Sequence, residues 1–120
     1  MGVYMKRYCL ALDLKDDPQL IAEYEAYHQN VWPEILQSIS GAGISNMEIY
    51  RISNRLFMIM DSDPAAAAGA RSTDDSDNPH VRAWEALMGE LQQELPFPTR
   101  GAGAGKWQLL EHIYSLTEQP

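Results

Sequence analysis

The stretch "ISNMEIYRISNRLFMIMD", residues 44–61, decides how this chain folds. It contains two runs rich in strand-forming residues, "ISNMEIYRI" and "RLFMIMD", joined by a short polar segment, and this pattern is typical of a β-hairpin. Along the first run, Met47 and Ile49 alternate with Glu48 and Tyr50, so each pair occupies its own face of the strand. The sequence therefore predicts an antiparallel hairpin at the middle of the chain.

The segments on either side of the hairpin alternate between strand and helix patterns. Residues 3–14, "VYMKRYCLALDL", predict a strand, and Asp17-Pro18 then starts a helix whose apolar stripe runs to Gly41. A second start signal at Asn78-Pro79 opens another helix, and "KWQLLEHIY", residues 106–114, predicts the last strand. The stripe of that second helix is Val81, Trp84, Leu87 or Met88, Leu91 and Leu95.

The order β-α-β-β-α-β predicts an α+β fold of the ferredoxin-like type, an antiparallel sheet with both helices on one face. The other face of such a sheet is left uncovered, and aromatic residues lie along the strands. Two sheets pairing face to face would bury them, so we expect a homodimer. The aromatic residues in question are Tyr8, Tyr50, Phe57 and Tyr114.

Composition bounds the function. The 120 residues fit a single domain, 1–120, and the formal net charge of -8, with nine scattered Lys and Arg, argues against nucleic acid or an anionic membrane as partner. The single cysteine, Cys9, excludes an internal disulfide and suits a reducing compartment. No signal-peptide pattern or apolar run of roughly 20 residues is present, and we expect a cytoplasmic protein without a membrane span.

His28 is the first candidate for chemistry, because it lies within the apolar stripe of the first helix. The simplest interpretation is a histidine packed at the edge of the core. However, Tyr24 precedes it by one helical turn, and Pro33 follows it and cannot donate to the carbonyl of Gln29. The helix must therefore bend or restart just past His28, which opens room for a pocket beneath the imidazole.

Trp84 is the second candidate. A tryptophan on a helical stripe is most often a core residue, but aromatic faces beside polar groups also hold sugars, and Glu85 can bind hydroxyl groups. Met47 lines the same cavity if it faces the helices and belongs to the dimer contact if it does not.

Other patterns do not indicate a bound cofactor or metal. The three histidines, His28, His80 and His112, lack metal-ligand spacing, so we expect no metal site. The segment "GAGAGKW" lacks the spacing of a phosphate-binding loop, and Gly101–Gly105 is better interpreted as a hinge or mobile loop near the cavity mouth.

Four segments of the chain form a recognisable set of motifs. They are "Y-x-x-x-H-x-x-V/I-W-P-E" (Tyr24–Glu34), "N-x-x-I-Y" (Asn46–Tyr50), "R-L-F-M-I-M" (55–60) and "N-P-x-V-R-A-W-E-x-L-M" (Asn78–Met88). Together they resemble the L-rhamnose mutarotase family, and the similarity covers nearly the whole chain, from about residue 5 to residue 116. The resemblance implies a dimeric ferredoxin-like α/β barrel that interconverts the α and β anomers of a 6-deoxy-L-hexose without a cofactor. It also implies that His28 is the proton donor and Tyr24 a sugar-binding tyrosine.

Two positions depart from the family pattern. Met47 stands where the family has a sugar-binding tyrosine, and Trp84-Glu85 stands where it has a Trp-Trp pair. The catalytic position is kept while these specificity positions are changed, which makes L-fucose a candidate substrate beside L-rhamnose.

The expected mechanism is general acid and base catalysis by His28, which exchanges a proton with the anomeric hydroxyl or ring oxygen, with Tyr24 or a water as the opposite partner. Trp84 and Met47 would pack against the apolar side of the sugar. Two alternatives remain: a ferredoxin-like dimeric monooxygenase or cyclase acting on an aromatic compound, and a non-catalytic sugar-binding or regulatory module.

Overall fold

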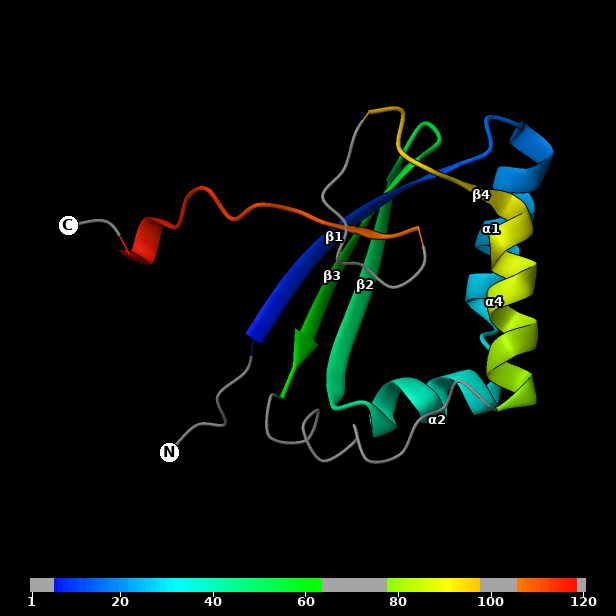
Figure 1. Ribbon diagram of the computed structural model, residues 1–120, viewed down its shortest axis with the longest axis horizontal. Helices are drawn as coiled ribbons and strands as arrows, with labels where there is room; N and C mark the ends of the chain where they lie inside the picture. The colour runs from blue at the N-terminus through cyan, green and yellow to red at the C-terminus, as the bar shows by residue number, and fades with distance from the viewer. Residues whose placement is uncertain (1–5, 64–77, 98–105, 119–120) are drawn as a thin grey trace.

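The computed structural model describes residues 6–63, 78–97 and 106–118, in which an antiparallel sheet carries three α-helices on one side (Figure 1). The predicted β-α-β-β-α-β order is confirmed, except that the first helix is divided in two, the second helix is shorter, and two short strands replace the last strand. The elements are β1 (Lys6–Leu14), α1 (Pro18–Gln29), α2 (Pro33–Gly41), β2 (Ile44–Ile52), β3 (Arg55–Ser62), α4 (Pro79–Leu91), β4 (Gln92–Gln93), β5 (Gln108–Leu109) and the 3-10 turn η2 (Leu116–Glu118).

The predicted hairpin is confirmed. Strands β2 and β3 pair from Ile44 opposite Ser62 to Ile52 opposite Arg55, and β3 also pairs along β1. The turn between them is two residues long, and Ser53 adopts a positive φ of 52°, as the tight turns of hairpins require. Asn54 then ties this turn to the end of β1, because its side-chain amide donates to the carbonyl of Leu14 at 2.9 Å.

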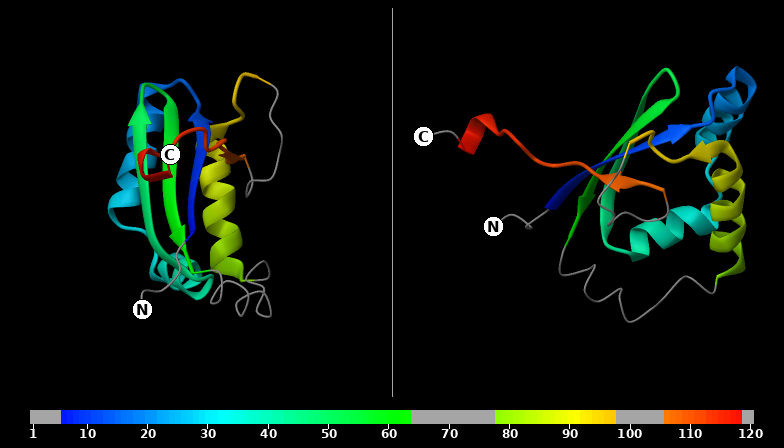
Figure 2. Two further views of the ribbon diagram at one scale, coloured as in Figure 1. Left: turned by 90° about the vertical axis from the view of Figure 1, so that its left-hand side faces the viewer. Right: turned by 45° about the horizontal axis from the view of Figure 1, so that its top comes forward.

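The last predicted strand, at the edge of the sheet beside β1, differs from the prediction. Instead of one strand over residues 106–114, two short strands, β4 and β5, pair with the same side of β1. After β5, the backbone N–H of Leu110 donates to Cys9, and the chain then leaves the sheet on the side away from the helices (Figure 2). The second predicted helix is also shorter than expected. It ends at Leu91, not Leu95, because Gln92 turns extended and pairs with β1.

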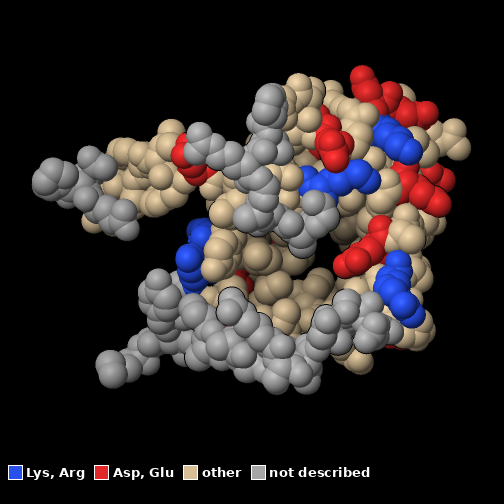
Figure 3. All heavy atoms as spheres, in the orientation of Figure 1, with Lys and Arg blue, Asp and Glu red and all other residues tan. Residues whose placement is uncertain are grey.

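The first predicted helix is divided into two, as Pro33 indicated. α1 ends at Gln29, and Pro33 occupies the first turn of α2, where its missing N–H breaks no hydrogen bond. Because α2 runs across the end of α1 and α4, the sheet and the helices do not close fully on each other. Figure 3 shows a hollow between them, with a surface formed mostly by residues other than Lys, Arg, Asp and Glu.

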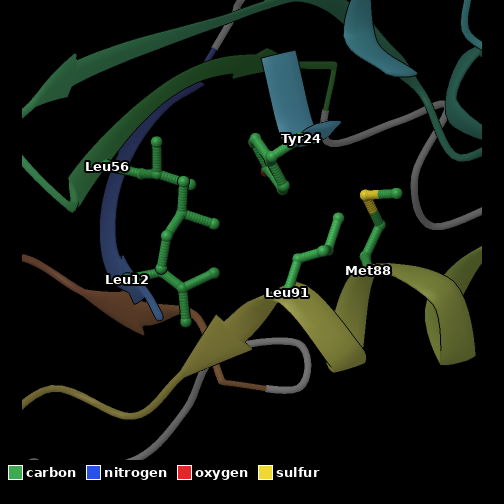
Figure 4. Close-up of a cluster of buried hydrophobic side chains, with 6 residues drawn as sticks. Leu12, Tyr24, Leu56, Met88 and Leu91 are labelled. Carbon is green, nitrogen blue, oxygen red and sulfur yellow. The ribbon is translucent and has the colours of Figure 1, made fainter. Parts of the chain in front are cut away.

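The core lies where the end of β1 and the beginning of β3 meet α1 and α4 (Figure 4). Leu12 and Leu14 of β1 and Leu56 of β3 are almost completely buried there. Tyr24 enters the same cluster from α1, and α4 contributes Met88 and Leu91.

The register assigns the remaining strand residues to faces. Tyr50 and Phe57 are cross-strand partners on the open face, as expected of its aromatic surface. Tyr8, expected to join them, instead shares the helix-facing side with Leu10 and Leu12, because alternate residues of a strand point the same way. Tyr114 lies outside the sheet, in the segment that follows β5.

The predicted loop at Gly101–Gly105 lies outside the described residues. Within the described part of the chain, none of the helices has the length and apolar character needed to span a bilayer.

Candidate active site

His28 lies in the last turn of α1, a helix fixed at its other end by Asp17. The Asp17 carboxylate accepts hydrogen bonds from the backbone N–H groups of Gln19, at 2.9 Å, and Leu20, at 3.4 Å. Nδ1 of His28 lies 2.8 Å from the backbone carbonyl oxygen of Tyr24. Since a carbonyl can only accept, Nδ1 carries the hydrogen of this bond, and the lone pair of the neutral ring is at Nε2.

Burial sets the protonation state of this imidazole. The His28 side chain is half-buried, and desolvation lowers its pKa from the ordinary 6.5, although the hydrogen bond to the Tyr24 carbonyl opposes that shift. The ring is therefore neutral at neutral pH. A neutral imidazole with Nδ1 bonded to the backbone leaves Nε2 able to accept a proton.

Tyr24 lies beside His28, as the four-residue spacing predicted. Their rings stack with centroids 4.2 Å apart and planes 28° from parallel. The Tyr24 side chain is buried. Burial raises the pKa of Tyr24 to about 12, with the nearby Gln92 side chain acting in the opposite direction, so the phenol stays protonated.

Trp84 of α4 is at the centre of an aromatic group that joins three helices. The centroid of its ring lies 5.5 Å from that of His28, 6.4 Å from that of Tyr27 and 5.1 Å from that of Trp32, and each pair is edge-to-face. Sequence reasoning missed Tyr27 and Trp32 as site residues. The position of Trp32 immediately before Pro33 was the available signal, because the break in the helix directs this side chain back toward α4.

Met47 lies on the helix-facing side of β2, the position that makes it a candidate for lining the cavity. Its cross-strand partner is Met60, which in turn pairs with Tyr8 of β1. All three side chains are only partly buried, whereas Leu12 and Leu56 on the same face are covered by the helices. This part of the sheet therefore has an incomplete helical cover, in agreement with the hollow in Figure 3.

Glu85 is not brought into the group around His28. It is exposed on α4, about 100° around the helix axis from Trp84. The other histidines are also apart from His28: His80 lies 4.0 Å from Glu34 at the surface, and His112 belongs to the exposed segment after β5. Within residues 6–63, 78–97 and 106–118, no three His, Cys, Asp or Glu side chains are close enough to hold a metal ion together.

The fold and this site define an α+β protein with a ferredoxin-like sheet and a half-buried neutral histidine beside Tyr24 and Trp84. Residues 7–116 match the family model described as L-rhamnose mutarotase, and the chain belongs to this family. It is 43% identical to the L-fucose mutarotase of Xanthomonas campestris pv. campestris over 120 aligned positions, which cover 95% of this chain and 90% of that one.

Two solved structures have a similar fold. The L-rhamnose mutarotase of Formosa agariphila superposes with a TM-score of 0.64 at 22% identity, covering 92% of this chain and 98% of its own. Tetracenomycin F2 cyclase of Streptomyces glaucescens, a type-II polyketide cyclase, superposes with a TM-score of 0.55 at 16% identity. The match covers 95% of this chain and 99% of the cyclase chain. At these identities the likeness concerns the fold alone.

Proposed function

We propose that this protein is a cofactor-independent sugar mutarotase that interconverts the α and β anomers of a 6-deoxy-L-hexose, with L-fucose favoured over L-rhamnose. The observation that carries the proposal is the state of His28, a neutral ring with Nδ1 bonded to Tyr24 and Nε2 left as a base beside Trp84. The family and the Xanthomonas relative supply the substrate class.

The reaction needs one proton removed and one delivered. Nε2 of His28 takes the proton of the anomeric hydroxyl, whose electrons form the aldehyde C=O as the bond between C1 and the ring oxygen breaks. The ring oxygen receives a proton from a water, and the chain recloses on the opposite face of the aldehyde by the reverse transfers. Water takes this part because burial raises the pKa of the Tyr24 hydroxyl and makes it a weak acid.

The Tyr24 carbonyl stabilises the imidazolium that forms between these transfers. It already accepts the Nδ1 hydrogen at 2.8 Å, so the positive charge strengthens a hydrogen bond that exists in the resting site. Little more is required, because anomers interconvert in water without a catalyst and a positioned acid or base contributes about 10² to 10⁴ in rate.

The sugar would lie with its apolar side on Trp84 and its methyl group toward Met47. Both side chains are partly exposed, Trp84 on α4 and Met47 on the helix-facing side of β2, which supports this placement. Glu85 is exposed beside Trp84, and we keep for it a contact with sugar hydroxyls at the rim. The 43% identity to an L-fucose mutarotase supports L-fucose, as do the departures from the family pattern at Met47 and Glu85.

Saturation transfer between the two anomeric proton signals tests this proposal. The exchange rate is measured for L-fucose and, separately, for L-rhamnose, with and without a small amount of the protein. We expect acceleration with both sugars and a larger kcat/KM with L-fucose. Equal or greater efficiency with L-rhamnose would contradict the assignment of L-fucose, and no acceleration with either sugar would contradict the mutarotase itself.

An aromatic ligand is the outcome to examine if both sugars fail. The cyclase with the same fold and the methionine and tryptophan side chains around the hollow favour such a ligand. A thermal-shift screen separates the possibilities: stabilisation by deoxy-L-sugars without turnover indicates a sugar-binding module, and stabilisation by polycyclic aromatics indicates the cyclase or monooxygenase alternative.

We also propose that the protein is a homodimer that pairs the open faces of two sheets. Ile52 is 68% exposed on that face, and Ile113, in the segment that leaves the sheet on the same side, is 89% exposed. Burial of such side chains is favourable by about 25 cal/mol per Å², and a second copy supplies a matching apolar surface.

The lone cysteine agrees with a cytoplasmic location, which fractionation of expressing cells would test.

Sedimentation velocity tests the dimer with matched variants. Ile52→Glu and Ile113→Glu each introduce a charge on the proposed contact, whereas Leu36→Glu changes an apolar residue of α2 that is 52% exposed on the helical side. We expect the first two variants to dissociate and the third to remain dimeric. A monomeric wild-type protein at micromolar concentration, or dissociation by Leu36→Glu alone, would refute this arrangement.

A further inference from the structure

The helix-facing side of the sheet carries a row of side chains that ends in a phenol. Tyr8 of β1, Met60 of β3 and Met47 of β2 are cross-strand neighbours, so their side chains lie next to one another across the sheet. All three are only partly buried, whereas Leu10 and Leu12, further along the same face of β1, are buried. The row therefore borders the part of the sheet where the helical cover is incomplete, and Tyr8 supplies its hydroxyl group.

The ring of Tyr8 has a defined place, but its hydroxyl is left available. Nζ of Lys6, which lies on the same face of β1, is 5.1 Å from the centre of the Tyr8 ring, and this contact favours one position of the ring. Among the residues that the structure describes, none forms a hydrogen bond with the Tyr8 hydroxyl. A phenol can donate and accept a hydrogen bond, so this group can bind a hydroxyl of a ligand.

The proposed position of the sugar brings one particular hydroxyl toward this row. His28 belongs to the helix layer, and the row belongs to the sheet that faces it (Figure 1). A sugar whose anomeric hydroxyl meets Nε2 of His28 therefore turns the opposite side of its ring toward the sheet. In a pyranose the carbon opposite C1 is C4, and C5, which carries the methyl group, is next to it. With the methyl group toward Met47, the C4 hydroxyl is directed along the row toward Tyr8.

We propose that Tyr8 is a specificity-determining residue whose hydroxyl binds the C4 hydroxyl of the sugar. This inference rests on the proposed function for the class of sugar and for the position of its anomeric end. The C4 hydroxyl is axial in L-fucose and equatorial in L-rhamnose, so a phenol fixed on the sheet distinguishes the two orientations. Tyr8 thereby contributes to the preference for L-fucose.

The variant Tyr8→Phe, assayed with three sugars, isolates this contact. The third sugar is 6-deoxy-L-glucose, which differs from L-fucose only at C4 and from L-rhamnose only at C2. We expect KM for L-fucose to rise about fivefold, the factor that corresponds to one ordinary hydrogen bond, and kcat to change little because the base is untouched. The preference for L-fucose over 6-deoxy-L-glucose should fall by the same factor. The preference between 6-deoxy-L-glucose and L-rhamnose, which is set at C2, should match the wild type.

Tyr50→Phe is the matched control. It removes a hydroxyl from the same sheet, but on the open face, where the Tyr50 hydroxyl donates to Glu48, and we expect wild-type KM values. Titration with each sugar, followed by tryptophan fluorescence, gives a dissociation constant that does not depend on turnover. Here too we expect Tyr8→Phe to weaken the binding of L-fucose about fivefold.

The outcomes separate this inference from the proposed function. Unchanged KM and Kd for L-fucose in Tyr8→Phe, a loss confined to kcat, or an equal loss with 6-deoxy-L-glucose would overturn the inference, and an active wild type would leave the mutarotase in place. Binding of L-fucose that depends on Tyr8, without anomeric exchange in the wild type, would support the inference and contradict the proposed function alone. A wild-type protein that binds none of the three sugars would overturn both.

Discussion

His28→Asn separates the two nitrogens of the imidazole and is the most direct test of the mechanism. The asparagine side-chain N–H can replace Nδ1 as donor to the Tyr24 carbonyl, which lies 2.8 Å from Nδ1, but it offers no base in place of Nε2. We therefore expect a folded protein in which the hydrogen bond to the backbone is kept and the proton acceptor is absent.

The two consequences differ in size. Loss of a general acid or base lowers kcat by about 10² to 10⁴, equivalent to roughly 2.7 to 5.5 kcal/mol of barrier. Loss of the ring contacts with Tyr24 and Trp84 lowers the free energy of unfolding by only about 1 kcal/mol, because aromatic pairs contribute about 0.5 to 1.5 kcal/mol and this ring is half-buried. The variant should thus lose activity while most of its stability remains.

The assay is anomeric exchange by NMR, with urea unfolding followed by circular dichroism as the measure of stability. His80→Asn is the matched control, because His80 is an exposed histidine near Glu34 and away from the aromatic group. If His28→Asn is folded and retains activity within about threefold of the wild type, Nε2 is not the base and the reasoning fails.

Three other predictions follow from charge and packing. Because burial keeps the pKa of His28 below 6.5, kcat/KM should be level above pH 6.5 and should decline at lower pH, where the base becomes protonated. The free energy of unfolding should decline over the same acidic range, because the unfolded chain, with the higher histidine pKa, binds the proton first. Measurements of kcat/KM and of urea unfolding as a function of pH check both statements. Arg55→Met should lower the urea midpoint more than Arg7→Met, because Arg55 pairs with Asp13, whose side chain is 4% exposed, and Arg7 pairs with the more exposed Asp61; equal midpoints would contradict it. Trp84→Leu should raise KM for the sugar about tenfold and Trp84→Phe about threefold in anomeric-exchange assays, because phenylalanine keeps an aromatic face; a larger effect of Trp84→Phe would argue against stacking.

Local patterns predicted the parts of the fold that local contacts determine. The alternation along residues 44–61 and the tight turn at Ser53 are enough to specify the hairpin. The division of the first helix follows from Pro33, whose ring and missing N–H act within one turn. The ends of α4 and of the last strand depend instead on pairing with β1, which lies far away in sequence and competes with helix continuation at Gln92.

The same distinction applies to the candidate site. The contact of Tyr24 with His28 follows from their spacing on one helix. The partners that sequence reasoning missed, Tyr27 and Trp32, meet Trp84 through tertiary packing, and only Trp32 had a local signal, its place directly before Pro33. Glu85 was placed by motif position alone, and the helix angle of about 100° per residue sets it apart from Trp84.

The proposed mechanism needs one histidine, and the break between α1 and α2 gives His28 its setting in a fold that resembles that of a polyketide cyclase. Within α1, the carbonyl of Tyr24 is reached by the imidazole of His28 without any partner from another element. The tautomer is therefore set by the helix itself, and the tertiary fold has only to leave Nε2 uncovered. The chain restarts at Pro33, so α2 departs across the end of α1, and Trp32 packs on Trp84. We therefore attribute the proposed chemistry to the side chains of α1 and α4 and not to the fold, since one fold can serve unrelated functions.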